Sequence, residues 1–192
     1  CEKIENMPPD VSQYQYYIDC CKEVNIPDIQ LKIDQMLIFD YLILNEDRHF
    51  NNFGLIRNAD SLKYHDVAPL FDHGNSLCFQ DDEHQFDTKI DLSKPFECRH
   101  FEQIKYVTNI DWLDFSALND IENDMRKVFQ TSPFMSQERI DSICKKFKQR
   151  IELLRIFKIE KKKNPNFIPS NDVRFNPLNE DMEKLRESLS HS

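Results

Sequence analysis

The chain has 192 residues and a formal net charge of −9 at pH 7. This length is that of one ordinary domain with a hydrophobic core, and the acidic balance argues against a general nucleic-acid binder, because phosphate backbones are bound mainly through clustered Lys and Arg. Only two residues are glycine, while Leu, Ile, Lys, Glu, Asp and Asn are abundant. This composition predicts a mainly helical fold.

The six cysteines contain no C-x-x-C pair and no regular framework, which is typical of reduced thiols in a cytosolic protein. No apolar run is long enough to span a bilayer and no signal peptide is present. We therefore predict a cytoplasmic protein with no membrane contact and no direct nucleic-acid binding. Because the chain starts at Cys1 without an initiator Met, we expect it to be a piece of a larger protein.

Two helices are predicted in the first 44 residues. In 11–24, apolar and aromatic residues recur at steps of three and four; they are Val11, Tyr14, Tyr17, Ile18 and Cys21. In 28–44, apolar residues occur on nearly all sides, which indicates a buried helix, since a surface helix keeps a polar face. Such a helix would deliver the loop that starts at Asn45 from inside the core.

A small β-hairpin is predicted next. The runs 53–56 and 62–65 are extended in character, and the Asn and Asp residues between them suit a turn. In this hairpin Asn52 and Asp72 lie at the same end of the two strands, so residues distant in sequence can share one ion.

The remainder is predicted to be a polar loop at 75–91 followed by helices at 101–107, 112–129 and 136–159. Asp111 and Ser136 are expected to cap the last two. We place a domain at 1–160 and a linker from 161 to the end of the chain. A stripe of Met182, Leu185 and Leu189 could form an amphipathic helix that docks back or binds a partner, or could be a frayed terminus.

Three side chains in 45–74 have the types and order that a metal-dependent phosphoryl transferase needs. Asp47 can orient an acceptor hydroxyl and take its proton, and the neighbouring Arg48 is expected to keep that carboxylate ionised. Asn52 and Asp72 offer an amide oxygen and a carboxylate for Mg²⁺ that also binds ATP phosphates. Gly74 would relax the backbone after Asp72.

Two histidines lie beside these residues, and both are predicted to belong to the nucleotide-binding site. His49 follows Arg48, and we expect it to pack and form hydrogen bonds, because Asp47 already fills the role of base. His73 follows Asp72 directly. A plain alternative is that Asp47, Arg48 and His49 form a salt-bridged turn at a helix end, but Asn52 at its offset and the downstream pattern favour a catalytic loop.

The pattern Asn45-x-Asp-Arg-His-x-x-Asn52, followed by Asp66-x-Ala-Pro-Leu-Phe-Asp72-x-Gly74, resembles the C-terminal half of HipA-like serine/threonine kinases, the toxin components of bacterial toxin–antitoxin pairs. The resemblance implies the helical large lobe of a protein-kinase-like fold with a small β-hairpin at the active site. It also implies Asp47 and Arg48 as catalytic residues, Asn52 and Asp72 as magnesium ligands, ATP as phosphate donor, a protein substrate with a Ser or Thr acceptor, and an antitoxin partner.

Two other readings stay open. The Asp-Arg-His-x-x-Asn core is also similar to the catalytic loop of phosphatidylinositol kinases, although Glu46 stands where a glycine usually precedes the Asp. Kinases further need a Gly-rich loop and a nucleotide-binding lysine in an N-terminal lobe, and neither pattern is found here. We therefore expect the isolated chain to be inactive without that lobe, or else to be a non-catalytic binding module on a kinase scaffold.

Overall fold

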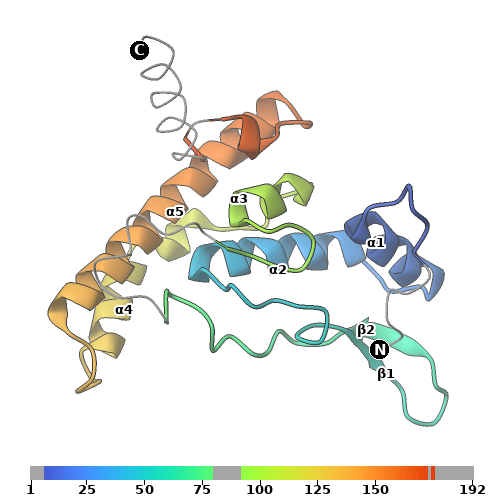
Figure 1. Ribbon diagram of the computed structural model, residues 1–192, viewed down its shortest axis with the longest axis horizontal. Helices are drawn as coiled ribbons and strands as arrows, with labels where there is room; N and C mark the ends of the chain where they lie inside the picture. The colour runs from blue at the N-terminus through green and yellow to red at the C-terminus, as the bar shows by residue number, and fades with distance from the viewer. Residues whose placement is uncertain (1–6, 80–91, 173, 176–192) are drawn as a thin grey trace, which may run out of the picture. The chain divides into compact units, whose positions relative to one another are not determined.

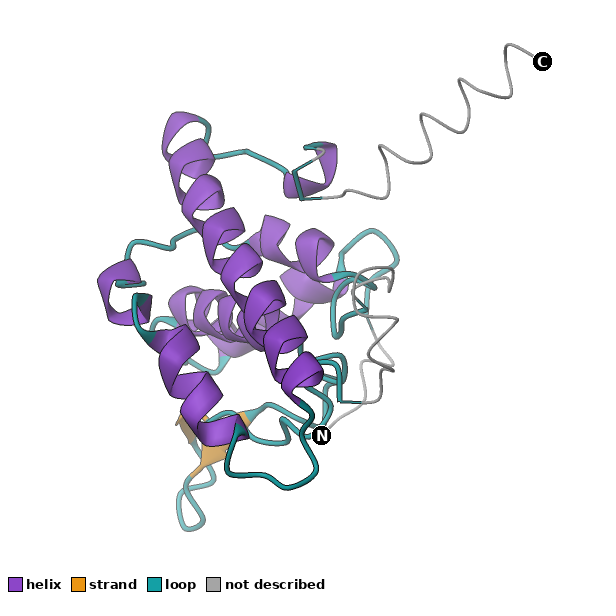
Figure 2. Cartoon of the chain, turned by 90° about the vertical axis from the view of Figure 1, so that its left-hand side faces the viewer, coloured by secondary structure: helices purple, strands orange, loops and turns teal. Residues whose placement is uncertain are grey.

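The computed structural model describes residues 7–79, 92–172 and 174–175. It divides into two compact units, Cys1–Trp112 and Leu113–Ser192. In the described residues the regular structure is mainly helical, with one two-stranded antiparallel sheet (Figures 1 and 2). The predicted fold class, mainly α with a small β-hairpin, is confirmed.

The first unit is built on α2 (Ile29–Ile43), which contacts α1 (Gln13–Glu23), α3 (His100–Gln103) and the 3-10 helix η2 (Ile104–Tyr106) (Figure 1). Both predicted N-terminal helices are present. Ser12 caps α1 by accepting a hydrogen bond of 3.2 Å from the backbone N–H of Gln15. Helix α2 is buried on most sides, as predicted, although Phe39 is 40% exposed.

Two acids, Asp34 and Asp40, are buried in this apolar helix. Asp34 accepts hydrogen bonds from the backbone N–H of Thr108 at 3.1 Å and of Asn109 at 2.9 Å. Burial raises the pKa of Asp34, and these hydrogen bonds oppose that rise. The contact fixes the segment after η2 to the middle of α2, and Asp40 plays the corresponding part at the end of the helix.

The predicted hairpin is formed by β1 (Leu55–Arg57) and β2 (Tyr64–Val67), which pair in antiparallel register with Leu55 opposite Val67. The strands begin two residues later than expected. Phe53, just before β1, is buried, with its ring 5.2 Å from that of Tyr17. A hydrogen bond of 2.8 Å from Ala68 to Gly54 extends the pairing toward the loop.

In the second unit the predicted helix at 112–129 is broken. The 3-10 helix η3 (Phe115–Leu118) is followed by a separate helix α4 (Ile121–Phe129). The cap expected at Asp111 lies instead at Asp114, whose carboxylate accepts from the N–H of Ser116 at 2.8 Å. Asn119 and Asp120 stand at the break, and such residues favour turns and helix ends over helix interiors.

Helix α5 (Gln137–Lys163) begins at the predicted cap, where the Ser136 hydroxyl accepts from the N–H of Arg139 at 3.0 Å. It ends at Lys163, four residues after the predicted helix end at Ile159. Phe167 and Phe175 follow it, and their rings lie 6.2 and 6.4 Å from that of Phe157. The described part of the tail therefore packs back onto α5. The stripe predicted at Met182, Leu185 and Leu189 lies outside the described residues.

Across 7–79, 92–172 and 174–175, none of the helices combines the length and the apolar character needed to cross a membrane.

Replacing Ser136 by Ala is expected to lower the free energy of unfolding by about 1 kcal/mol, because the first turn of α5 loses its side-chain acceptor. Urea unfolding of the full-length protein measures this change. Ser142→Ala, inside the same helix, is the matched control and should leave stability unchanged or slightly raised, since Ala is the better helix former. Equal stability of the two variants would contradict the capping role.

Candidate functional site

The loop begins where α2 ends in a tight turn. Leu44 is in the left-handed region with φ 55°, and its backbone N–H donates to the carbonyl of Asp40. The N–H of Asn45 donates to the same carbonyl at 3.0 Å. The chain therefore leaves the buried helix abruptly, and Asn45 remains inside the core with no exposed surface.

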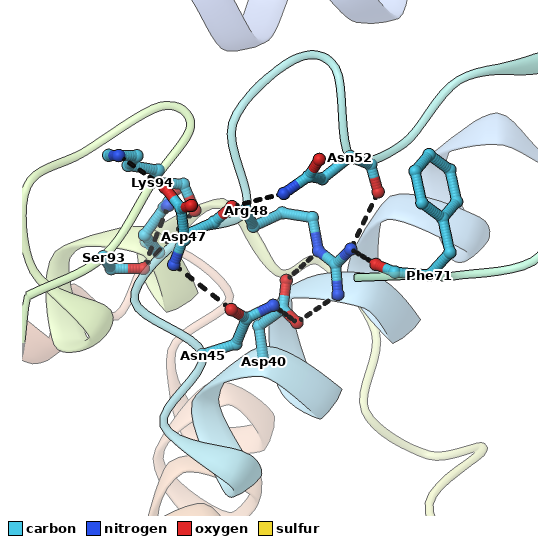
Figure 3. A network of polar contacts seen from close by, with 9 residues as sticks. Asp40, Asn45, Asp47, Arg48, Asn52, Phe71, Ser93 and Lys94 are labelled. Atoms are coloured by element: carbon cyan, nitrogen blue, oxygen red, sulfur yellow. Dashed lines mark hydrogen bonds and ion pairs between the residues drawn. The ribbon is translucent and has the colours of Figure 1, made fainter. Parts of the chain in front are cut away.

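Asn45 links the helix to the loop through both ends of its amide. Its Nδ2 donates to Asp40 Oδ1 at 2.9 Å, and its Oδ1 accepts from the backbone N–H of Asp47 at 3.1 Å. The backbone at Asp47 is thus held by a side chain that is itself held by α2 (Figure 3).

Arg48 forms a buried, two-pronged ion pair with Asp40. Its Nε and Nη2 donate to Asp40 Oδ2 and Oδ1, both at 2.8 Å, and its side chain has no exposed surface. Paired N–H groups match the two oxygens of a carboxylate, which makes this geometry both specific and strong.

The remaining Arg48 nitrogen joins two distant stretches of backbone. Nη1 donates to the carbonyl of Asn52 at 2.8 Å and to that of Phe71 at 2.6 Å (Figure 3). Phe71 directly precedes Asp72, so one guanidinium holds both stretches that carry the predicted magnesium ligands. Asn52 in turn donates from Nδ2 to the backbone carbonyl of Asp47 at 2.8 Å. The backbone at Asp47, at Asn52 and at Phe71, the residue before Asp72, is thereby held by one set of hydrogen bonds.

The Asn52 amide has a fixed orientation. Its nitrogen is used by the Asp47 carbonyl, and its oxygen points away from that carbonyl (Figure 3). The residue is 4% exposed. An amide oxygen held in this way is preorganised as a neutral ligand for a hard cation.

Asp72 is exposed, and its backbone is in the left-handed region with φ 57°. Gly74 does not have a positive φ. The expectation that Gly74 relaxes the backbone is therefore wrong, and the left-handed conformation occurs at Asp72 itself. Asp tolerates this region better than most residues. Beyond it, the carbonyl of Asn75 accepts from Glu46 at 3.0 Å and Leu77 donates to Ile43 at 2.7 Å, which holds this segment against the end of α2.

The Asp47 carboxylate is partly exposed and faces a cation. Lys94 Nζ lies 2.6 Å from Oδ1, while Asn75 Nδ2 and His49 Nε2 lie 3.4 and 3.9 Å from Oδ2. The hydrogen bond from Lys94, above all, holds the pKa of Asp47 below its usual value. The role expected of Arg48, keeping Asp47 ionised, thus falls to Lys94, because the Arg48 guanidinium is turned into the core toward Asp40.

A cavity of about 450 Å³ opens beside the Asp47 carboxylate. Its lining combines two acids, one lysine and several apolar or small side chains. They are Glu46, Asp47, Asn75, Phe79, Leu92, Ser93, Lys94 and Cys98.

The two predicted histidines have different surroundings. His49 is partly exposed, near the Asp47 carboxylate, and its Nδ1 accepts from the backbone N–H of Asn51 at 3.2 Å. His73 packs its ring edge-on against Phe39 of α2 at 5.2 Å, with Nε2 buried and without a hydrogen-bond partner among the described residues. His49 therefore borders the carboxylate, whereas His73 is turned toward α2.

The donors present fit a magnesium ion that is shared with phosphates. In the described residues no cluster of three or more His, Cys, Asp or Glu side chains could hold a metal by itself. One preoriented amide oxygen, on Asn52, and one exposed carboxylate, on Asp72, are the kind of pair that suffices when phosphate oxygens and waters complete the coordination shell.

Two residues of the site were missed from the sequence. Asp40 had a signal, because an acid inside an otherwise apolar helix needs a partner, and Arg48 stands two turns further on. Lys94 had none, since it is separated from Asp47 by 46 intervening residues and belongs to a segment without periodicity.

No protein-family model and no curated protein matches the chain. A crystal structure of the proinflammatory kinase CtkA from Helicobacter pylori is similar, with 23% sequence identity and a TM-score of 0.45. The similarity covers 69% of this chain and 57% of that one. A likeness of this degree does not by itself establish a fold or an activity for this chain.

Replacing Arg48 by Met is expected to lower the free energy of unfolding by about 3–5 kcal/mol, because Asp40 is left as an uncompensated buried charge and two carbonyls lose their donor. Chemical denaturation of the full-length protein measures the loss. Lys127→Met, which breaks an exposed pair with Asp124, is the control and should change stability little. A loss below about 1 kcal/mol in the Arg48 variant would contradict the central role of this pair.

Proposed function

We propose that this chain carries the hydroxyl-orienting and magnesium-binding residues of a HipA-like serine/threonine protein kinase. The observation that carries the proposal is the way Arg48 Nη1 holds the carbonyls of Asn52 and Phe71 while the Asn52 amide holds the carbonyl of Asp47. These contacts support the proposal because they hold the backbone at Asp47, at Asn52 and next to Asp72, the three residues that phosphoryl transfer would use.

Asp47 orients the acceptor. Its carboxylate is ionised, partly exposed and beside a cavity, and its backbone is fixed by Asn45 and Asn52. A hydroxyl entering the cavity would donate its hydrogen bond to this carboxylate, which positions the oxygen for attack and accepts the proton as the new bond forms. Because the loop is anchored on a buried helix, the ordering cost is met on folding and not during the reaction.

Asn52 and Asp72 hold the metal. Bound magnesium would neutralise charge on the phosphates of ATP. The fixed amide oxygen of Asn52 adds no negative charge near those phosphates, and the exposed carboxylate of Asp72 supplies the anionic ligand.

The acceptor class rests on the motif pair. The Ala-Pro-Leu-Phe-Asp run favours a HipA-like kinase, and with it a protein Ser or Thr acceptor and an antitoxin partner. A phosphatidylinositol acceptor is the alternative. To distinguish the two, the full-length protein, with any segment that precedes or follows this chain, is incubated with labelled ATP and either Ser/Thr peptides or phosphatidylinositol vesicles. If that protein binds no Mg-ATP in calorimetry, the non-catalytic binding module is the correct reading.

Replacing Asp47 by Asn in the full-length protein should lower kcat for phosphorylation at least about 100-fold, because the amide can neither accept the acceptor's proton nor orient it with a negative charge. The change is nearly isosteric, so the unfolding midpoint should move little. Asp60→Asn in the exposed hairpin turn is the matched control. Activity within a factor of three of wild type would remove Asp47 from the mechanism.

Replacing Asp72 by Asn should weaken magnesium-dependent nucleotide binding at least about 10-fold, since the only anionic ligand of the proposed pair is lost. Calorimetric titration with a non-hydrolysable ATP analogue, with and without Mg²⁺, measures this change. Nucleotide binding without Mg²⁺ should be the same in both proteins. A Mg²⁺ dependence equal to that of wild type would show that the metal is held elsewhere.

A further inference from the structure

Lys94 places a cation directly against the Asp47 carboxylate, and the proposed function uses it only to keep that carboxylate ionised. The Nζ–Oδ1 distance is 2.6 Å, the lysine side chain is 52% exposed, and both residues line the same cavity. Most exposed ion pairs of this kind contribute little. What matters here is how firmly the chain around the lysine is held.

The segment around Lys94 is anchored on both sides. Before it, Ser93 is buried, its N–H donates to the carbonyl of Cys98 at 2.9 Å, and its hydroxyl accepts from Gln103 Nε2 at 3.2 Å. After it, the ring of Phe96 packs against two aromatic residues of the loop that carries Asn52; its ring centre lies 5.8 Å from that of Phe50 and 6.3 Å from that of Phe53.

The aromatic cluster extends this anchor to α1 and η2. The Phe96 ring also lies 5.3 Å from Tyr14, 6.2 Å from Tyr17 and 6.1 Å from Tyr106. Phe50 and Phe53 lie on either side of Asn52 in the loop. The same aromatic cluster therefore holds both this loop and the backbone next to Lys94. The backbone on both sides of Lys94 is therefore held by packing and hydrogen bonds, and from there the lysine side chain reaches the Asp47 carboxylate.

The chemistry of transfer calls for a cation at this place. In phosphoryl transfer, charge on the phosphoryl oxygens must be stabilised next to the oriented acceptor hydroxyl. Lys94 has three N–H donors on a flexible four-carbon stem, and Asp47 uses one of them. An anion that enters the cavity beside the Asp47 carboxylate would meet this ammonium.

We propose that Lys94 is a catalytic residue that contacts the phosphoryl group during its transfer, an inference that rests on the proposed kinase function. The acceptor oxygen forms a bond to the γ-phosphorus of ATP, and the bond from that phosphorus to the bridging oxygen breaks, its electron pair leaving with ADP. The acceptor proton passes to the Asp47 carboxylate. Lys94 keeps its proton throughout and offsets the phosphoryl charge.

The test compares Lys94→Met with Lys94→Arg in the full-length protein, with Lys127→Met as an exposed Lys–Asp control. Two quantities are measured: kcat with Mg-ATP, and the affinity for Mg-ADP with and without aluminium fluoride, which imitates the phosphoryl group in transfer. Lys94→Met should lower kcat about 100-fold, leave the affinity for Mg-ADP unchanged and abolish the gain from aluminium fluoride. Lys94→Arg should retain part of kcat and part of the gain in affinity from aluminium fluoride. Lys127→Met should match wild type in both quantities.

The inference is overturned if Lys94→Met keeps the gain in affinity from aluminium fluoride and a kcat within about threefold of wild type. It is also overturned if the activity of Lys94→Met rises, because the lysine would then inhibit the enzyme by blocking the Asp47 carboxylate. Thermal unfolding checks that the variants are folded, and the midpoint should change little because the Lys94 side chain is half-exposed. If wild type itself neither binds Mg-ADP nor turns over, the proposed function fails, and the inference fails with it.

Discussion

The buried ion pair between Asp40 and Arg48 is the constraint on which the site depends. Moving two charges out of water is costly, and their attraction offsets that cost only when the geometry is good and the remaining donors are satisfied. Here the two short hydrogen bonds to Asp40 and the two to backbone carbonyls meet both conditions. The ion pair fixes the position of the backbone, because one guanidinium holds the carbonyls of both Asn52 and Phe71.

The loop is held from its other side by aromatic packing. Phe53 is buried against Tyr17, and Phe50 and Phe96 complete the contact. Polar contacts thus fix the backbone from the direction of α2, and apolar contacts fix it from the direction of α1. Between them the Asp47 carboxylate remains partly exposed. A partly exposed carboxylate on a firmly held backbone is the arrangement that the proposed catalytic loop would require.

Much of this arrangement was predictable, and the exceptions have physical causes. The helices before the loop, the hairpin and the cap at Ser136 follow from local periodicity and turn chemistry, which act over a few residues. The break at Asn119 and Asp120 was missed because apolar spacing continued across it. The placement of Lys94 depends on Phe96 packing among residues from three distant segments, and no local pattern encodes such a contact. The partner of Arg48 was assigned to the adjacent Asp47, whereas burial selected Asp40.

We propose that Asp47, Asn52 and Asp72 surround one magnesium-nucleotide site. Manganese takes the same oxygen ligands as magnesium, and its unpaired electrons broaden nearby NMR signals. The most direct test adds a manganese complex of a non-hydrolysable ATP analogue to the isotope-labelled full-length protein. The amide signals of all three residues are expected to broaden together. Broadening at only one of the three, or at none, would contradict this proposal.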